Sequence, residues 1–263
     1  MLNKIYFISA VTDFELYNRL VCQNEFVKNN KQIERVSFDN SRDNQFISKR
    51  YNQFLNNYDY SQEAWFVFCH SDWEIKEDIA EKLNSLDVNK IYGPTGSKLL
   101  FEEGYYFREG RGQIYSKRRN GSDERYPISE KFEDAYEVDT LDCQAVIIHS
   151  SLVKSYGLRF DEHLEYDLYV EDFCISALLN HGIETNICKI KCCHWSDAGY
   201  ISFHPRYNNM LKYVNKKYPN HAFGGTVSVI GGKEITILSP QERLLKQLRK
   251  NIRQNLINDG KKY

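Results

Sequence analysis

The hydrophobic pattern of the first ninety residues switches repeatedly between two periods. Dense apolar runs, which are typical of strands, occupy residues 4–11, 33–38, 65–69 and 90–92. Between these runs, apolar residues at three- and four-residue spacing predict helices over 13–29, 41–58 and about 76–86. Strands that alternate with helices favour right-handed crossovers and a parallel sheet, so the pattern predicts an α/β fold.

The run at 65–69, Trp-Phe-Val-Phe-Cys, is apolar at every position. A strand of this kind is covered on both faces, as in the centre of a parallel sheet. His70 and Asp72 follow at its carboxyl end, where open α/β sheets bind ligands. In extended backbone their side chains would point the same way. An imidazole and a carboxylate facing one cleft predict a divalent cation that holds a phosphate-bearing ligand, although such pairs also occur on surfaces that bind nothing.

The second half of the chain has a less regular pattern. Glycines punctuate short aromatic runs over 93–136, which predicts hairpins and loops above the cleft. Three further elements are expected, namely an apolar strand over 137–149, a helix over 169–180 that ends at Gly182, and a strand over 185–194.

An acidic pair, Glu171 and Asp172, opens the helix expected over 169–180. The helix dipole favours carboxylates in a first turn, so the pair has an ordinary structural explanation. The functional alternative is that Asp172 is a general base that takes a proton from an attacking hydroxyl, with Glu171 beside it. Both explanations stay open on the sequence.

Seven cysteines are spaced irregularly and no secretory signal precedes them, so we expect reduced thiols and a cytoplasmic protein. The segment 188–194 holds three cysteines and a histidine, a composition found in zinc sites. It falls on one predicted strand, however, without the turn that paired zinc ligands need, and buried cysteine is an ordinary apolar residue. His194 at the end of this strand is the better ligand. With Asp72 it would form a site for Mn²⁺ or Mg²⁺.

The tail at 226–263 is expected to form a hairpin and then a basic amphipathic helix. Its helical spacing gives an apolar stripe of Leu244, Leu245, Leu248, Ile252 and Leu256. The same helix carries the cations Arg243, Lys246, Arg249, Lys250 and Arg253. Such a helix either packs on its own domain or on a second subunit of a homo-oligomer, which is the simpler explanation, or docks on an anionic membrane surface.

Net charge, hydrophobicity and missing motifs count against several classes of function. The formal net charge of −1 gives no overall field that would favour nucleic acid. No apolar run approaches the roughly 18 residues of a membrane-spanning helix. The phosphate-binding G-x-x-x-x-G-K-[ST], the dinucleotide-binding G-x-G-x-x-G and the hydrolase G-x-S-x-G motifs do not occur.

Short motifs in a consistent order resemble the GT-A glycosyltransferases, specifically family-2-like bacterial enzymes whose Asp-x-Asp metal motif is replaced here by His70-Ser71-Asp72. The other matching segments are 8–11, 51–52, 138–142, 158–162, 169–172 and 194–196. The resemblance covers about residues 3–200. It implies a Rossmann-like, mixed but mainly parallel sheet flanked by helices, with a C-terminal helical extension. The implied domain spans 1–225, with a nucleotide-binding half at 1–92 and an acceptor half at 93–225.

The resemblance also implies an inverting transfer of sugar from a nucleoside diphosphate, most readily UDP, to a hydroxyl of a glycan or lipid-linked acceptor in bacterial surface polysaccharide synthesis. Asp72 and His194, with His70, would bind Mn²⁺ or Mg²⁺ at the departing diphosphate. Asp172 and Glu171 would be catalytic. The nucleotide sugar would contact Ser9, Ala10, Val11, Asp39, Tyr51, Asn52, His70 and Ser71, and the acceptor would contact Asp142 and Trp195.

A non-catalytic nucleotide-sugar or carbohydrate-binding module is the alternative, because a fold does not by itself confer an activity. The substitution of His70 for the usual first acid keeps this alternative open. We expect a cytoplasmic protein with at most a peripheral membrane contact through its tail.

Overall fold

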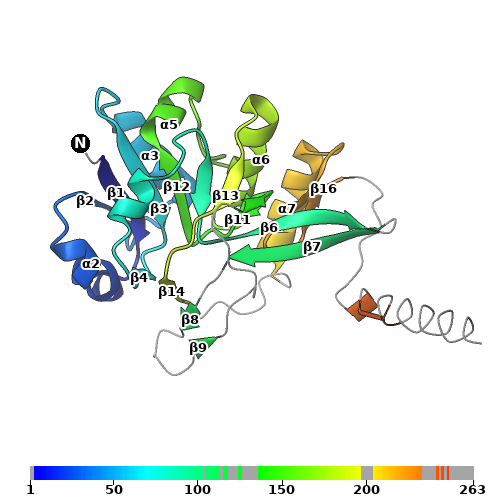
Figure 1. Ribbon diagram of the computed structural model, residues 1–263, viewed down its shortest axis with the longest axis horizontal. Coiled ribbons are helices and arrows are strands. Elements are labelled where there is room, and N and C mark those ends of the chain that lie inside the picture. The colour runs from blue at the N-terminus through cyan, green and yellow to red at the C-terminus, as the bar shows by residue number, and fades with distance from the viewer. Residues whose placement is uncertain are drawn as a thin grey trace, which may run out of the picture.

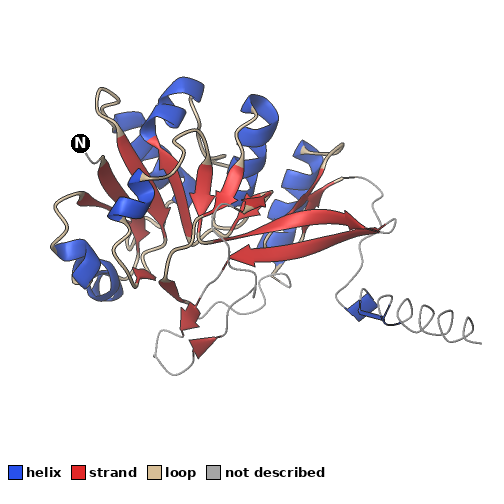
Figure 2. Cartoon of the chain, in the orientation of Figure 1, coloured by secondary structure: helices blue, strands red, loops and turns tan. Residues whose placement is uncertain are grey.

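A computed structural model describes residues 3–102, 105–112, 115–117, 124–125, 136–196 and 204–232, together with Gln241, Glu242, Leu244, Leu245 and Leu248. A seven-stranded sheet lies at its centre, and a long hairpin extends from one side (Figure 1). Helices pack on both faces of this sheet, as Figure 2 shows, and each face has its own apolar core.

The strands of the central sheet are β1 (Lys4–Val11), β2 (Ile33–Asp39), β3 (Ala64–Cys69), β5 (Ile91–Gly93), β10 (Glu137–Val138), β12 (Ala145–His149) and β13 (Thr185–Ile187). Their order is β10-β13-β5-β12-β3-β1-β2. The strand β12 is antiparallel to β3 and β5, and β10 is antiparallel to β13, whereas the remaining pairs are parallel. Five of these seven strands therefore run in one direction, and β10 and β12 run in the other. The expected mixed, mainly parallel α/β sheet is confirmed.

Strand β3 is buried along its whole length, as its unbroken apolar run predicts. Phe66 and Phe68 belong to the core on one face of the sheet. Trp65, Val67 and Cys69 belong to the core on the other face. Successive side chains of a strand point to opposite faces, so a strand covered by helices on both sides needs an apolar residue at every position.

The helical segments are α1 (Phe14–Tyr17), the π-helical η1 (Asn18–Cys22), α2 (Glu25–Lys28), α3 (Ile47–Asn57), α4 (Ala80–Asn84), α5 (Ser150–Tyr156), α6 (Tyr169–His181) and α7 (Pro205–Lys217). The helix expected over 13–29 is therefore broken, because the Asn24 side chain accepts from Phe26 N and starts α2. Helix α3 begins later than expected, since a turn precedes it in which Asn40 Nδ2 donates to Gln45 O at 2.7 Å. Gly182 ends α6 in the left-handed conformation, as predicted.

The strand expected over 137–149 is wrong as a single element. Backbone hydrogen bonds divide it, because β11 (Thr140–Leu141) pairs with β6 (Thr95–Glu102) in a separate three-stranded sheet. Asp142 then forms a turn in which its Oδ1 accepts from Gln144 N at 3.1 Å. This turn returns the chain to the central sheet as β12, so the apolar pattern continues although the chain changes sheets.

The strand expected over 185–194 is also wrong as a single element. It consists of β13 in the central sheet and β14 (Cys192–Trp195) in a four-stranded sheet with β4 (Trp73–Ile75), β8 (Tyr115–Lys117) and β9 (Glu124–Arg125). Cys188 lies between the two strands and its N–H donates to Gly93 O at 2.9 Å. The three cysteines of this segment, Cys188, Cys192 and Cys193, are buried, in agreement with an apolar role.

A hairpin of β6 and β7 (Tyr105–Gly112) accounts for part of the 93–136 region, where hairpins are expected. A second hairpin, β15 (Ala222–Gly224) with β16 (Val229–Gly231), lies across the expected boundary at 225, and Ile230 is buried in the same core as α6. The five described tail residues are helical; the rest of the expected tail helix lies outside the described residues. Among the described helices, none has the length and apolar character needed to cross a bilayer.

Candidate metal centre

Two segments that are far apart in the sequence meet beyond the carboxyl end of β3. The chain turns sharply after this strand, since Trp73 N donates to His70 O at 3.2 Å. Strand β4 then pairs antiparallel with β14, which puts His194 opposite Trp73. Trp195 N also donates to Asp72 O at 2.9 Å. The pairing of the two short strands therefore brings His194 to the His70–Asp72 turn.

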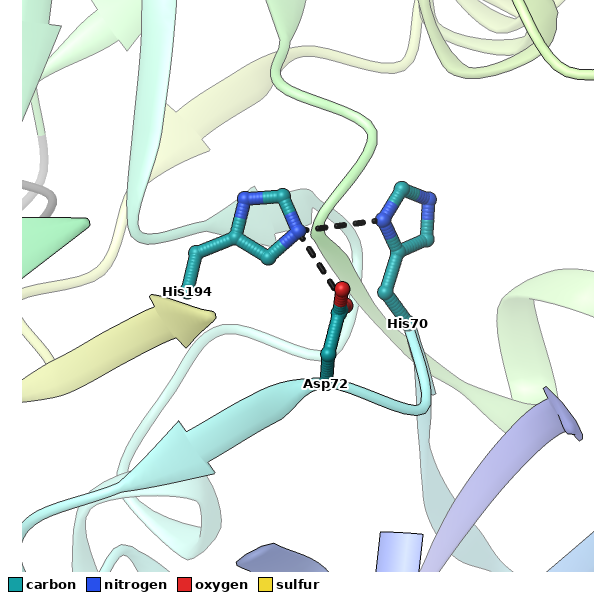
Figure 3. A group of neighbouring side chains, drawn as sticks. All are labelled: His70, Asp72 and His194. Atoms are coloured by element: carbon teal, nitrogen blue, oxygen red, sulfur yellow. Dashed lines mark hydrogen bonds and ion pairs between the residues drawn. The ribbon is translucent and has the colours of Figure 1, made fainter. Parts of the chain in front are cut away.

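His70, Asp72 and His194 point toward one another (Figure 3). His194 Nε2 lies 3.2 Å from Asp72 Oδ1 and 3.4 Å from His70 Nδ1. One ligand atom from each residue lies within 4.8 Å of the others. Adjacent ligands of an octahedral ion with bonds of about 2.2 Å are roughly 3.1 Å apart, so the two nitrogens and one oxygen fit a single cation with positions left for a bound ligand.

The protonation of His70 suits this role. Burial, and then the neighbouring His194, lower the pKa of the His70 imidazole to about 4, although Asp72 and Asp142 act in the opposite direction. The ring is therefore neutral at neutral pH. A neutral imidazole is the form that binds a metal ion.

A pocket of about 480 Å³ opens onto the three side chains, a volume ordinary for a ligand site. Its walls follow the carboxyl ends of three parallel strands. Ala10 and Thr12 come from the end of β1, Asn40 follows β2, and the His70–Asp72 turn follows β3. This is the edge of an open α/β sheet at which ligands generally bind.

Four of the residues expected to contact the nucleotide sugar line this pocket: Ala10, Tyr51, His70 and Ser71. Tyr51 comes from α3, and its hydroxyl donates to the Cys69 carbonyl at 3.1 Å. The structure therefore brings this part of the expected nucleotide site to the metal centre.

The other four expected nucleotide contacts are not among the lining residues. Ser9 is buried with its Oγ 3.4 Å from Cys69 Sγ, and Val11 belongs to the same apolar core as Cys69. Asp39 is exposed and accepts from the backbone and hydroxyl of Ser41. Asn52 braces the loop before α6, because its amide exchanges two hydrogen bonds of 2.9 Å with the Phe160 backbone.

The two expected acceptor residues lie beside the pocket and are not among its lining residues. The charge of Asp142 reaches His70, where it favours the protonated ring. Trp195 donates from Nε1 to Glu74 Oε2 at 2.7 Å, and the cation of Arg19 lies 4.9 Å from its ring centroid.

The acidic pair at the start of α6 is buried and directed toward other partners. Asp172 Oδ2 lies 2.8 Å from Lys217 Nζ, and Asp172 Oδ1 accepts from the Tyr218 hydroxyl at 2.8 Å. Glu171 Oε1 accepts from the Thr226 hydroxyl at 2.7 Å, and burial raises the pKa of Glu171 to about 7. Neither acid is among the residues that line the pocket.

Asp167 does line the pocket, and the sequence patterns missed it. Its side chain is 3% exposed, and its Oδ2 lies 2.8 Å from Nε of Arg206, another lining residue. The next residue, Leu168, has φ of 64°, a left-handed conformation that costs a non-glycine residue about 1 kcal/mol or more. This strained residue separates Asp167, which lines the pocket, from the first residue of α6. No sequence signal marked Asp167. Asn40, which follows the strand expected at 33–38, could have been found by the rule that ligands bind at the carboxyl ends of parallel strands.

No family model matches this chain, and no curated protein matches it in sequence. Among solved structures it is similar to residues 1–349 of S. aureus TarS, with a TM-score of 0.49 and 15% identity over 82% of this chain and 66% of that one. A longer TarS structure gives a TM-score of 0.49 and 16% identity over 82% and 40%. A197 from STIV gives 0.38 and 12% over 90% and 97%. The chain spans about two thirds of the shorter TarS structure, and likenesses at this level do not identify a function.

Proposed function

We propose that this protein is a metal-dependent glycosyltransferase of bacterial surface polysaccharide synthesis, which moves a sugar from a nucleoside diphosphate, most readily UDP, to a hydroxyl of a glycan or lipid-linked acceptor. The observation that carries the proposal is the convergence of His70, Asp72 and His194 in a pocket at the carboxyl edge of the sheet. A cation held there can neutralise a departing diphosphate. The class of reaction, sugar transfer, is inferred from the order of the short motifs that resemble GT-A glycosyltransferases.

The ligand set favours Mn²⁺ over Mg²⁺. Magnesium prefers oxygen ligands and keeps several waters, whereas transition metals accept imidazole nitrogen. Two of the three side chains here are histidines. His70 would bind through Nδ1, His194 through Nε2 and Asp72 through a carboxylate oxygen.

We place the general base at Asp167 and keep Asp172 as the alternative. Asp167 lines the pocket, where its carboxylate lies 2.8 Å from Nε of Arg206. Asp172 is bound to Lys217 and Tyr218 and is not among the residues that line the pocket. In a direct displacement, the acceptor oxygen forms a bond to the anomeric carbon while the bond from that carbon to the diphosphate breaks, and Asp167 receives the hydroxyl proton. The configuration of the sugar is thereby inverted.

The experiment is a transfer assay with a panel of nucleotide sugars and Mn²⁺, run on wild type, Asp167→Asn and Asp172→Asn. We expect Asp167→Asn to lower transfer by about 10²–10⁴-fold, the range for a lost acid–base group. Its binding of UDP and Mn²⁺ should survive, because the metal ligands are untouched. Loss of transfer in Asp172→Asn alone would instead assign the base to Asp172.

A non-catalytic module that binds nucleotide sugars is the second candidate. The observation in its favour is that both acids of the motif at the start of α6 are bound to other residues rather than facing the metal ligands. Hydrolysis of a UDP-sugar without acceptor distinguishes the two. Slow turnover that requires Mn²⁺ supports the enzyme, whereas binding of every donor without any turnover supports the module.

A further inference from the structure

Tyr169, the first residue of α6, is fully buried next to the metal centre. Its hydroxyl oxygen lies 3.0 Å from the carbonyl oxygen of Cys143 and 3.1 Å from Nε2 of His70. A tyrosine hydroxyl has one proton to donate, and a carbonyl can only accept. Because Tyr169 is 0% exposed, water cannot supply a hydrogen bond to a polar atom here that has no partner within the protein.

The Tyr51 hydroxyl also lies within hydrogen-bond reach of Tyr169, but its proton goes to the Cys69 carbonyl at 3.1 Å. With a neutral His70 ring, only one arrangement of protons then satisfies both contacts. In it, Tyr169 donates to the Cys143 carbonyl, and His70 donates from Nε2 to the tyrosine oxygen. In the opposite arrangement Tyr169 donates to His70 Nε2, which leaves two acceptor oxygens 3.0 Å apart with no proton between them. In the satisfied arrangement Nδ1 of His70 carries no proton and faces His194 Nε2 at 3.4 Å, so the proton of that contact belongs to His194, whose Nε2 also lies 3.2 Å from Asp72 Oδ1.

We propose that Tyr169 is a positioning residue that holds His70 in the Nε2–H tautomer and so presents the Nδ1 lone pair to the bound cation. The inference rests on the proposed metal site, and it names the group that orients one of its ligands. Metal-binding imidazoles generally donate their other ring N–H to such a partner, and removal of the partner typically weakens metal binding by about 10–100-fold. Tyr169 and Asp167 lie two residues apart. The chain at the start of α6 therefore carries both the residue that orients His70 and the proposed general base.

The tautomer is measured directly in the metal-free wild type, labelled with ¹⁵N in its histidine rings and assigned with His70→Gln. Nitrogen chemical shifts at neutral pH distinguish a protonated Nε2 from a protonated Nδ1. We expect His70 to carry its proton on Nε2. A proton on Nδ1 overturns the inference, and this test requires neither a bound metal nor a stable variant.

The second test is calorimetry of Mn²⁺ binding to Tyr169→Phe, which removes the hydroxyl and keeps the ring. We expect affinity to fall by about 10–100-fold. The control is Tyr207→Phe, a buried tyrosine whose hydroxyl contacts Ser228 Oγ at 2.6 Å and not the metal ligands; its affinity should stay within about twofold of wild type. Unchanged affinity in Tyr169→Phe contradicts the inference. If wild type binds no Mn²⁺, the metal dependence of the proposed function is wrong. The nitrogen chemical shifts of His70 then decide the tautomer by themselves.

Discussion

Lys217 Nζ lies 2.8 Å from the carboxylate of Asp172, which is 2% exposed, so a cation of α7 is bound to the first turn of α6. The same ammonium lies 3.0 Å from Asp161 Oδ2 in the loop before α6. Tyr218 completes the contact from the end of α7. These contacts give Asp172 a structural reason to be buried, because they join the first turn of α6 to the end of α7.

We therefore expect Asp172→Asn to destabilise the protein by about 1.5–3 kcal/mol, the usual net contribution of hydrogen bonds to a charged group. Urea denaturation of both proteins measures the difference. Asp43→Asn is the matched control, because Asp43 pairs with Arg50 at 2.7 Å but is 48% exposed, and exposed ion pairs contribute less than about 1 kcal/mol. Equal effects of the two substitutions would show that Asp172 is not held as the structure has it.

Glu171 predicts a pH dependence of stability. Burial raises its pKa from 4.5 to about 7, so between these values the folded protein holds a proton that the unfolded chain releases. The contribution of this group to stability is fully present below pH 4.5 and is lost as the pH rises through 7. Glu171→Gln does not titrate. Relative to wild type it should gain up to roughly 3 kcal/mol between pH 4.5 and 8, measured by denaturation at each pH. A constant difference across this range would mean that Glu171 is not buried in this way.

The sequence predicted the centre of the sheet well because burial on two faces leaves an unambiguous pattern. The expected strand at 4–11 coincides with β1, and the run after Trp65 is buried throughout. The same pattern failed where the chain leaves one sheet for another, since apolar residues continue on both sides of the turn at Asp142. The apolar pattern indicates that a segment is buried, but it does not indicate which elements the segment packs against.

The candidate site was predictable in part for the same reason. His70 and Asp72 follow a recognisable buried strand, and His194 ends a second apolar run, so both halves of the candidate metal centre carry a local signal. Asp167 carries none, because its place in the pocket depends on the left-handed Leu168 and on Arg206 from α7. Those features arise only when the helices have packed.

Three leucines of the C-terminal tail are largely exposed to solvent. Leu244, Leu245 and Leu248 are helical and 59%, 53% and 48% exposed, and no described part of the fold covers them. Because cations alternate with these leucines in the sequence, we propose that the tail binds an anionic membrane surface, which would place the protein at the inner face of the cytoplasmic membrane.

Sedimentation with vesicles tests this proposal. Wild type should bind vesicles that contain phosphatidylglycerol and not vesicles of phosphatidylcholine alone, and high salt should weaken the binding. Replacement of the three leucines by serine should abolish it. Absence of binding to either vesicle, with a dimer that the same substitutions dissociate, would assign the leucines to a second copy of the chain.

The most direct measurement is calorimetric titration of Mn²⁺, then of UDP with and without Mn²⁺, into wild type, Asp72→Asn and His194→Gln. Asp59→Asn, an exposed aspartate that accepts from Ser61, is the control. Wild type and the control should bind one Mn²⁺ per chain and bind UDP more tightly in its presence. Both site variants should lose more than about 100-fold in Mn²⁺ affinity, since a lost ligand costs more than a lost outer partner. Equal Mn²⁺ and UDP affinities in all four proteins would contradict a shared cation at Asp72 and His194.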